Sequence, residues 1–254
     1  MQLSEAQRDT FFEDGFVIIP NVFSPQEIER MRMSFERLLD MARSLEGKVI
    51  HEGAQFVVEQ RPHQQPPFCF HRVGWCGAVE PYLLEIGRSP KLLKMVSQLL
   101  GSQTVVHLLN QAHYKQPHDG LAFPWHQDSY HRRYGTSLWE DLNEKGSYVQ
   151  TAIALDDVTE ENGPLEFIPG SWRKGHIVRE VDEQPPFDVS SAVKGLMSTG
   201  DVVMFGPFTF HRSMPNESTS PRRILINGYA YPGANAREYT GSGTGIPLQV
   251  ETSS

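Results

Sequence analysis

The chain has 254 residues, 39% hydrophobic and 21% charged, a composition typical of a globular protein with one substantial core. Its net charge of −8 and pI near 5.7, with no Lys/Arg run longer than two residues, argue against a nucleic-acid or membrane-surface binder, because both partners reward clustered positive charge. These properties favour a small-molecule partner.

The sequence predicts a cytoplasmic location. Cys69 and Cys76 are spaced like neither a zinc ribbon nor a CxxC redox motif, so we expect free thiols in a reducing compartment. The N-terminus is charged from residue 5 onward, and no apolar run approaches the roughly 20 residues of a membrane span. We therefore expect no targeting signal. The sequence does not indicate the oligomeric state.

Capping patterns predict three helices in the first 101 residues. Ser4-x-x-Gln7 and Ser24-Pro25-x-Glu27 read as capping boxes at helix starts, and GFVIIP between them reads as a short strand. A third helix is predicted over residues 89–101. The second helix has an apolar face at helical spacing, formed by Ile28, Met31, Phe35, Leu38 and Leu39.

Residues 45–80 follow neither the helical nor the strand period and are rich in Pro, Gln and aromatic residues. Loops of this length within a compact domain are usually functional or mobile. We expect this segment to line the substrate pocket.

From residue 104 onward, short strand-like runs are separated by Gly, Pro, Asn and Asp turns. This pattern is typical of a β-sandwich or barrel. We predict a mainly β, single domain over 1–254, in which helices within about 1–101 brace a β core of about 102–231. The runs are TVVHLLNQAHYKQ, YVQTAIALDD, LEFIPG, DVVMFG and RRILINGYAYP.

His126 and Asp128, in PWHQDSYHRR, are separated by one residue. On an extended strand, residues i and i+2 point the same way, so the two side chains can converge on one ion. His211 lies 83 positions after Asp128, and together the three supply two imidazoles and one carboxylate. This set holds Fe(II) and leaves coordination positions open for a co-substrate and O₂.

Arg222 follows His211 by eleven positions, at the start of a strand-like run. A guanidinium is a bidentate, permanently charged partner for a carboxylate, and the hydroxyl of Ser213 could contact the same group. Arg223 is the competing choice, because neighbouring residues of a strand face opposite sides.

The motifs WHQD, ENGPLEFIPGSWRKGH, GDVVMF and HRSMPNESTSPRR resemble the phytanoyl-CoA dioxygenase family of iron(II)/2-oxoglutarate oxygenases. The similarity runs from about residue 8 to 231 and includes the opening FFEDGFVIIPNVFSPQEIERMR. It implies a double-stranded β-helix, or jelly-roll, core. It also implies that His126, Asp128 and His211 bind iron, and that Arg222 with Ser213 binds 2-oxoglutarate.

The resemblance implies that 2-oxoglutarate and O₂ are converted to succinate and CO₂ as the substrate is hydroxylated. Related halogenating enzymes replace the carboxylate ligand with a small residue, so an intact Asp128 favours oxygenation. In LLNQAHYKQP, alternation places Leu109, Gln111, His113 and Lys115 on one face, which is polar enough to suggest a pocket wall. We assign Gln111, His113 and also Gln127 to co-substrate binding.

The substrate is predicted to be a small polar or anionic molecule. His71, Arg72, Arg132 and Arg133 are cationic or potentially so and would suit a carboxylate or phosphonate. His131, close to the HxD motif, and Trp139 are further candidate substrate residues, and Trp75, Phe68 and Phe70 are candidates to close the pocket.

Three alternatives are weighed against this prediction. The first is a cupin-like metal-binding or sensor protein without turnover, and the second is an oxygenase acting on a CoA- or carrier-bound acyl group. The third is a zinc hydrolase, which lacks an HExxH-type base. The sensor and the hydrolase would both leave Arg222 unexplained.

Overall fold

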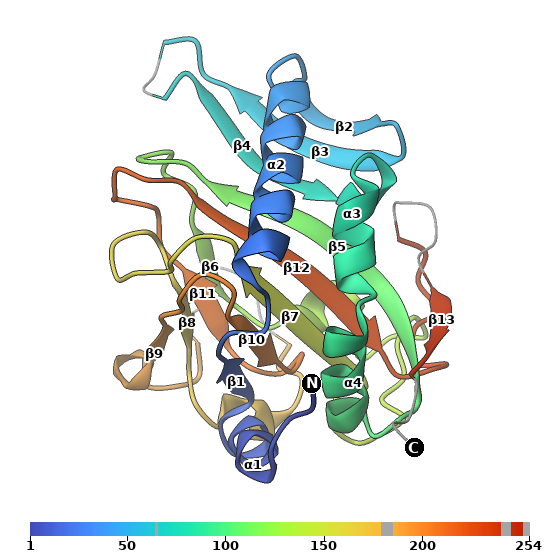
Figure 1. The fold of residues 1–254 in the computed structure, drawn as a ribbon. Coiled ribbons are helices and arrows are strands. Elements are labelled where there is room, and N and C mark those ends of the chain that lie inside the picture. The colour runs from blue at the N-terminus through green and yellow to red at the C-terminus, as the bar shows by residue number, and fades with distance from the viewer. Residues whose placement is uncertain (64–65, 179–184, 240–244, 251–254) are drawn as a thin grey trace.

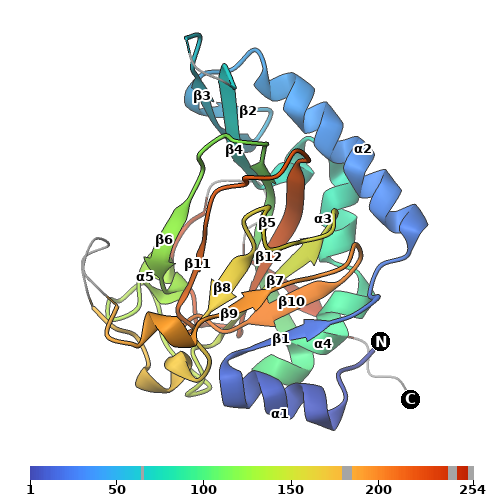
Figure 2. The same ribbon diagram turned by 90° about the vertical axis from the view of Figure 1, so that its left-hand side faces the viewer.

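The computed structural model describes residues 1–63, 66–178, 185–239 and 245–250. Within these ranges, nine strands form a large antiparallel sheet and four form a small one. Helices lie across one face of the large sheet, and the small sheet faces the other (Figures 1 and 2).

The large sheet has the order β1-β10-β7-β12-β5-β4-β3-β2, and β13 pairs with the first half of β5. The small sheet has the order β6-β11-β8-β9. The strands of the large sheet, in this order, are β1 (Phe16–Ile19), β10 (Val202–Phe205), β7 (Tyr148–Ala154), β12 (Arg222–Ala230), β5 (Thr104–Lys115), β4 (Phe68–Gly74), β3 (Ala54–Gln60), β2 (Gly47–His51) and β13 (Ile246–Gln249). Those of the small sheet are β6 (Phe123–His126), β11 (His211–Ser213), β8 (Leu165–Phe167) and β9 (Val193–Gly195).

The chain alternates between the two sheets from β5 to β12. Strands β5, β7, β10 and β12 belong to the large sheet, whereas β6, β8, β9 and β11 belong to the small one. This winding produces the predicted double-stranded β-helix, with the inner faces of the sheets opposed. Side chains on the two inner faces therefore meet between the sheets, which is where the site lies.

The predicted helix starts near the N-terminus are confirmed. Ser4 and Ser24 both form complete capping boxes, for α1 (Glu5–Asp14) and α2 (Pro25–Ala42), and α4 (Pro90–Leu100) ends at Gly101 in the left-handed conformation. Helix α2 buries Ile28, Met31, Phe35 and Leu38 against the sheet. The remaining helices are α3 (Pro81–Gly87), α5 (Asp128–Arg132) and the short 3₁₀ turns η1 (Cys76–Ala78), η2 (Ser171–Lys174) and η3 (Val189–Ser191).

The expectation of an irregular segment at 45–80 is wrong. The segment forms β2, β3 and β4, which extend the large sheet in antiparallel register. The register shifts between Val57 and Val58, and such a bulge breaks the two-residue period that the sequence reading relied on. The N-terminal part of the chain thus supplies sheet as well as helices, and β13 extends the sheet beyond residue 231.

Phe35 anchors α2 to the sheet. Its side chain is fully buried, its ring lies 5.0 Å from that of Tyr114 on β5, and the Tyr114 hydroxyl donates to the Phe35 carbonyl at 2.6 Å. We expect Phe35→Ala to lower the free energy of unfolding by about 3–5 kcal/mol, because it leaves a cavity under the helix. Met33→Ala, an exposed position on the same helix, should change it by less than about 0.5 kcal/mol. Urea unfolding measures both, and equal effects would contradict this packing.

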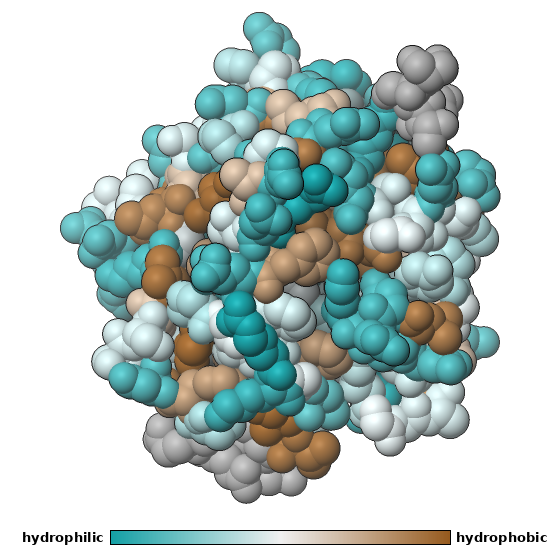
Figure 3. Space-filling view, turned by 90° about the horizontal axis from the view of Figure 1, so that it is seen from below, coloured by the Kyte–Doolittle hydropathy of each residue, from teal (hydrophilic) through white to brown (hydrophobic). Residues whose placement is uncertain are grey.

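Among the described residues, no helix is long and apolar enough to cross a membrane. The surface seen from below Figure 1 is a mosaic of hydrophilic residues and small apolar groups (Figure 3).

Candidate active site

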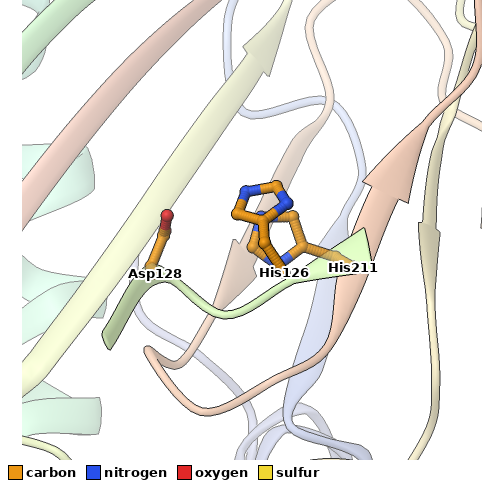
Figure 4. A group of neighbouring side chains, drawn as sticks. All are labelled: His126, Asp128 and His211. Carbon is orange, nitrogen blue, oxygen red and sulfur yellow. The ribbon is translucent and has the colours of Figure 1, made fainter. Parts of the chain in front are cut away.

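Three elements bring His126, Asp128 and His211 together. His126 ends β6 and pairs directly with His211 on the neighbouring strand β11, and their rings lie 4.2 Å apart. Asp128 opens α5 after an extended Gln127, so its side chain still projects to the same side as that of His126 (Figure 4). Ligand atoms of all three residues lie within 4.8 Å of one another.

The imidazoles are oriented by backbone carbonyls. Nδ1 of His126 lies 2.7 Å from the Pro124 oxygen, and Nδ1 of His211 lies 2.9 Å from the Thr209 oxygen. Because a carbonyl accepts, each Nδ1 carries the proton and donates it. Nε2 of each ring is then left with a lone pair for a metal.

The electrostatics of the triad suit a cation. Burial, and next the charge of His126, lower the pKa of His211 to about 4, so the ring is neutral at pH 7. Burial raises the pKa of Asp128, but His211, Arg132 and His126 outweigh it and hold this pKa below its ordinary value. Oδ2 of Asp128 is buried without a hydrogen-bond partner. A divalent ion would satisfy that oxygen, and two imidazoles with one carboxylate are a donor set for Fe(II). Within the described ranges this is the only metal-ligating cluster of three or more residues.

The triad opens into a cavity of about 650 Å³ between the two sheets. Leu109, Gln111 and His113 of β5 line it, so the face that the sequence pattern predicted does look inward. Lys115, the fourth residue of that face, lies outside the lining and donates from Nζ to the Met214 carbonyl. On β7, the cavity-facing residue is Gln150.

Arg222 and Ser213 both line the cavity and are almost completely buried. Nε of Arg222 lies 3.4 Å from the Asn162 carbonyl, and no carboxylate forms an ion pair with this arginine in the described part of the chain. Burial lowers the pKa of Arg222 to about 10, against the opposing charges of Asp119 and Asp156, so it stays cationic at pH 7.

Arg223 points the other way. Its guanidinium binds Asp156, with Nη2 2.7 Å from Oδ1, and it also contacts Glu36 of α2. The structure therefore presents Arg222, and not Arg223, to the cavity, as strand alternation requires.

Gln111 and His113 form one hydrogen-bonded pair on the cavity wall. Nε2 of His113 lies 3.0 Å from Oε1 of Gln111 and donates to it, because that oxygen only accepts. Burial, and then the charges of Arg72 and Arg222, push the pKa of His113 well below its ordinary value, so the ring is neutral.

Gln127, expected to bind the co-substrate, lines the cavity, and its amide group is bonded to three backbone groups. Its amide nitrogen donates to the carbonyls of Gly175 and Phe208 at 2.9 and 2.6 Å, and its oxygen accepts from the Ile177 backbone at 2.9 Å. These bonds tie the start of α5 to residues 175–177. The side chain thus holds two loops together beside the triad.

Three of the six expected substrate residues, Arg72, His131 and Arg132, line the cavity. His71 lies on the opposite face of β4, with Nε2 3.7 Å from Glu59. Trp139 packs against Tyr134, with ring centroids 5.1 Å apart, in a buried aromatic cluster. Contrary to expectation, the cavity lining does not include His71, Trp139 or Arg133. Strand direction turns His71 away, apolar packing holds Trp139, and Arg133 is exposed at the end of α5. Of the aromatics expected to close the pocket, Trp75 lines it, while Phe70 is buried in the main core and Phe68 packs against that core.

The sequence reading missed several cavity residues. Arg212 follows the proposed ligand His211 on β11, and the others come from the segment before residue 240, where no motif marks them. Nη1 of Arg237, in that segment, donates to the His131 carbonyl of α5 at 2.5 Å and so joins the segment to this helix. The missed lining residues include Arg212, Arg237, Glu238 and Tyr239, whereas Lys48 and Gln55 belong to residues 45–80, the segment expected to line the pocket.

Characterised proteins similar to this chain include L-proline trans-4-hydroxylase from Streptomyces griseoviridis, 26% identical over 85% of this chain and 82% of that protein. Ectoine dioxygenase from Bordetella bronchiseptica is 29% identical over 89% of this chain and 75% of its own length. Among solved structures, EvdO2 from Micromonospora carbonacea var. aurantiaca complexed with 2-oxoglutarate superposes with a TM-score of 0.67. It is 22% identical, with 96% of this chain and 98% of that chain covered, and it shares the fold.

The family model for phytanoyl-CoA dioxygenase (PhyH) matches residues 11–224, which include the whole triad and Arg222. The double-stranded β-helix and the two-His-one-carboxylate cluster provide the architecture and the iron donors that such an enzyme needs. The chain belongs to the phytanoyl-CoA dioxygenase family and is an iron(II)- and 2-oxoglutarate-dependent dioxygenase.

Proposed function

We propose that this enzyme hydroxylates a small anionic metabolite, with conversion of 2-oxoglutarate and O₂ to succinate and CO₂. His126, Asp128 and His211 hold the iron, and Arg222 with Ser213 holds the distal carboxylate of 2-oxoglutarate. Iron(II) supplies the site at which the co-substrate and O₂ react. The protein contributes orientation and exclusion of water.

The charge of the cavity is the observation that carries this proposal. Among the described lining residues, six are cationic and two are carboxylates, one of which is the iron ligand Asp128. Arg212 is neutralised by Glu166, at 2.8 Å. The excess of positive charge favours a substrate that brings negative charge of its own. The cationic lining residues are Lys48, Arg72, Arg132, Arg212, Arg222 and Arg237.

Arg72 illustrates this excess. It comes from β4, pairs in register with His113, and has no ion-pair partner within residues 1–63, 66–178, 185–239 and 245–250. Burial separates the Arg72 guanidinium from water and thereby lowers its pKa. After 2-oxoglutarate has occupied Arg222, Arg72 still faces the cavity without a counter-charge.

The shape of the cavity also supports a free small molecule over a CoA- or carrier-bound acyl group. A volume of about 650 Å³ lies within the usual range for small-molecule sites, and 2-oxoglutarate occupies part of it.

A substrate panel tests the proposal. Iron-loaded enzyme with 2-oxoglutarate and O₂ is given small carboxylates and phosphonates, their neutral amide or ester counterparts, and acyl-CoA thioesters, and succinate is measured. We expect at least one anionic compound to raise succinate formation above the substrate-free rate and to yield a hydroxylated product, with its neutral counterpart at least about tenfold less effective. Turnover with thioesters or neutral compounds alone would contradict an anionic substrate.

A further inference from the structure

Arg132 is a buried cation near the proposed iron ligands, and the proposed function counts its charge without giving it a role of its own. It lies on α5, four residues after Asp128, and it lines the cavity although only 6% of it is exposed. Residues four apart on a helix are neighbours on one face, so Arg132 and Asp128 lie on the same face of α5.

This guanidinium is incompletely satisfied. Nε and Nη1 are buried with no hydrogen-bond partner, and no carboxylate lies within ion-pair distance in the part of the chain that the structure describes. Two rings partly compensate its charge, since the guanidinium carbon lies 5.3 Å from the centroid of Tyr148 and 5.0 Å from that of Tyr239. Burying an unpaired charge is costly, so a site that keeps one has a use for it.

Burial lowers the pKa of Arg132, but Tyr148, Tyr239 and then Asp128 outweigh it and raise this pKa; of these three residues only Asp128 is a carboxylate. Once the carboxylate of Asp128 is coordinated to a divalent ion, its charge is directed to the metal. The positive charge of Arg132 is then largely uncompensated in the loaded enzyme, in the wall of the cavity.

The surroundings fix the guanidinium in place. The Tyr148 hydroxyl donates to Oε1 of Gln150 at 2.7 Å, which sets the ring that lies under Arg132. Gly228 of β12 is opposite Gln150, and a Cβ at this glycine would overlap the Tyr148 hydroxyl. Tyr148 and Gln150 therefore fit only beside a glycine, and together they form a rigid support.

We propose that Arg132 binds the acidic group of the substrate, a carboxylate or a phosphonate, on the Asp128 side of the iron. This inference rests on the proposed function and makes it more specific. It places the acidic group within a few bonds of the carbon to be oxidised, because Arg132 and Asp128 share one turn of helix. Arg222 thus binds 2-oxoglutarate and Arg132 binds the acidic group of the substrate, so the two anions occupy separate positions in the cavity.

Calorimetric titration with sulfate and with acetate tests the inference. The enzyme is kept anaerobic with Fe(II) and saturating 2-oxoglutarate, so that Arg222 is occupied, and the visible charge-transfer band of the iron–2-oxoglutarate chelate reports loading. We expect the wild type to bind at least one of the two anions and Arg132→Gln to weaken that binding about tenfold or more. The preference for acetate or sulfate distinguishes a carboxylate from a phosphonate substrate.

Arg133→Gln is the matched control. It removes the same charge one position along, at an exposed residue outside the cavity lining, and should bind the anion as the wild type does. If Arg132→Gln does not fold, Arg132→Met, which keeps the apolar stem, takes its place. Wild-type anion affinity in either folded Arg132 variant overturns the inference, as does absence of anion binding to wild type that shows the band. Absence of the band itself overturns the proposed function.

Discussion

Replacement of Asp128 or His211 by Ala is expected to weaken iron binding strongly and to abolish 2-oxoglutarate turnover while the fold is retained. Each variant removes one of three ligands whose donor atoms lie within 4.8 Å, and two protein ligands hold Fe(II) much less well than three. Oδ2 of Asp128 accepts no hydrogen bond, so Asp128→Ala leaves no donor at this oxygen without its partner. Metal content after anaerobic reconstitution and succinate formation are the measurements.

His118→Ala provides the comparison for these variants. Its side chain is 58% exposed and lies near Glu217, away from the triad. It should bind iron and turn over 2-oxoglutarate like the wild type. Full activity in Asp128→Ala or His211→Ala, with a native circular dichroism spectrum, would remove the assignment of these residues as ligands.

Loss of Arg222 should act on the co-substrate. We expect Arg222→Ala to raise the apparent KM for 2-oxoglutarate by about one to two orders of magnitude, because it deletes a charge-assisted contact worth roughly 1.5–3 kcal/mol. Because Arg222 is buried in the cavity wall, water cannot easily replace its contact with the co-substrate. Initial rates of succinate formation over a range of 2-oxoglutarate concentrations give the value.

Arg223→Ala separates this effect from a general loss of arginine on β12. Its ion pairs with Asp156 and Glu36 join β12 to α2 and to the loop after β7, so its removal should lower the melting temperature and leave the KM unchanged. An increased KM in Arg223→Ala and an unchanged KM in Arg222→Ala would reverse the assignment.

Much of the fold follows from local patterns. Ser4 and Ser24 define helix starts because capping depends on residues three apart, and the apolar face of α2 depends on spacing within one helix. The strand-like runs after residue 104 all correspond to strands. Together with separated motifs in the expected order, these patterns were sufficient to predict the double-stranded β-helix and the family.

The candidate site could be predicted in part. The residues of the triad were identified from a short motif, the later His211 and the family resemblance, and the structure brings them together. Arg222 was preferred to Arg223 from its spacing, and the register of β12 turns it toward the cavity. Their roles in binding iron and 2-oxoglutarate stay predictions until the variants are measured.

Elements with local signals could be predicted from the amino-acid sequence: capped helices, alternating strands, and the pair His126 and Asp128 on one short extended segment. The tertiary structure alone decided which side of a strand faces the cavity, as with His71 and Arg72, and which of two adjacent arginines is buried, as with Arg132 and Arg133. Bulges, strand register and the direction of α5 set these outcomes. They depend on pairing between residues far apart in the chain, which a local period does not record.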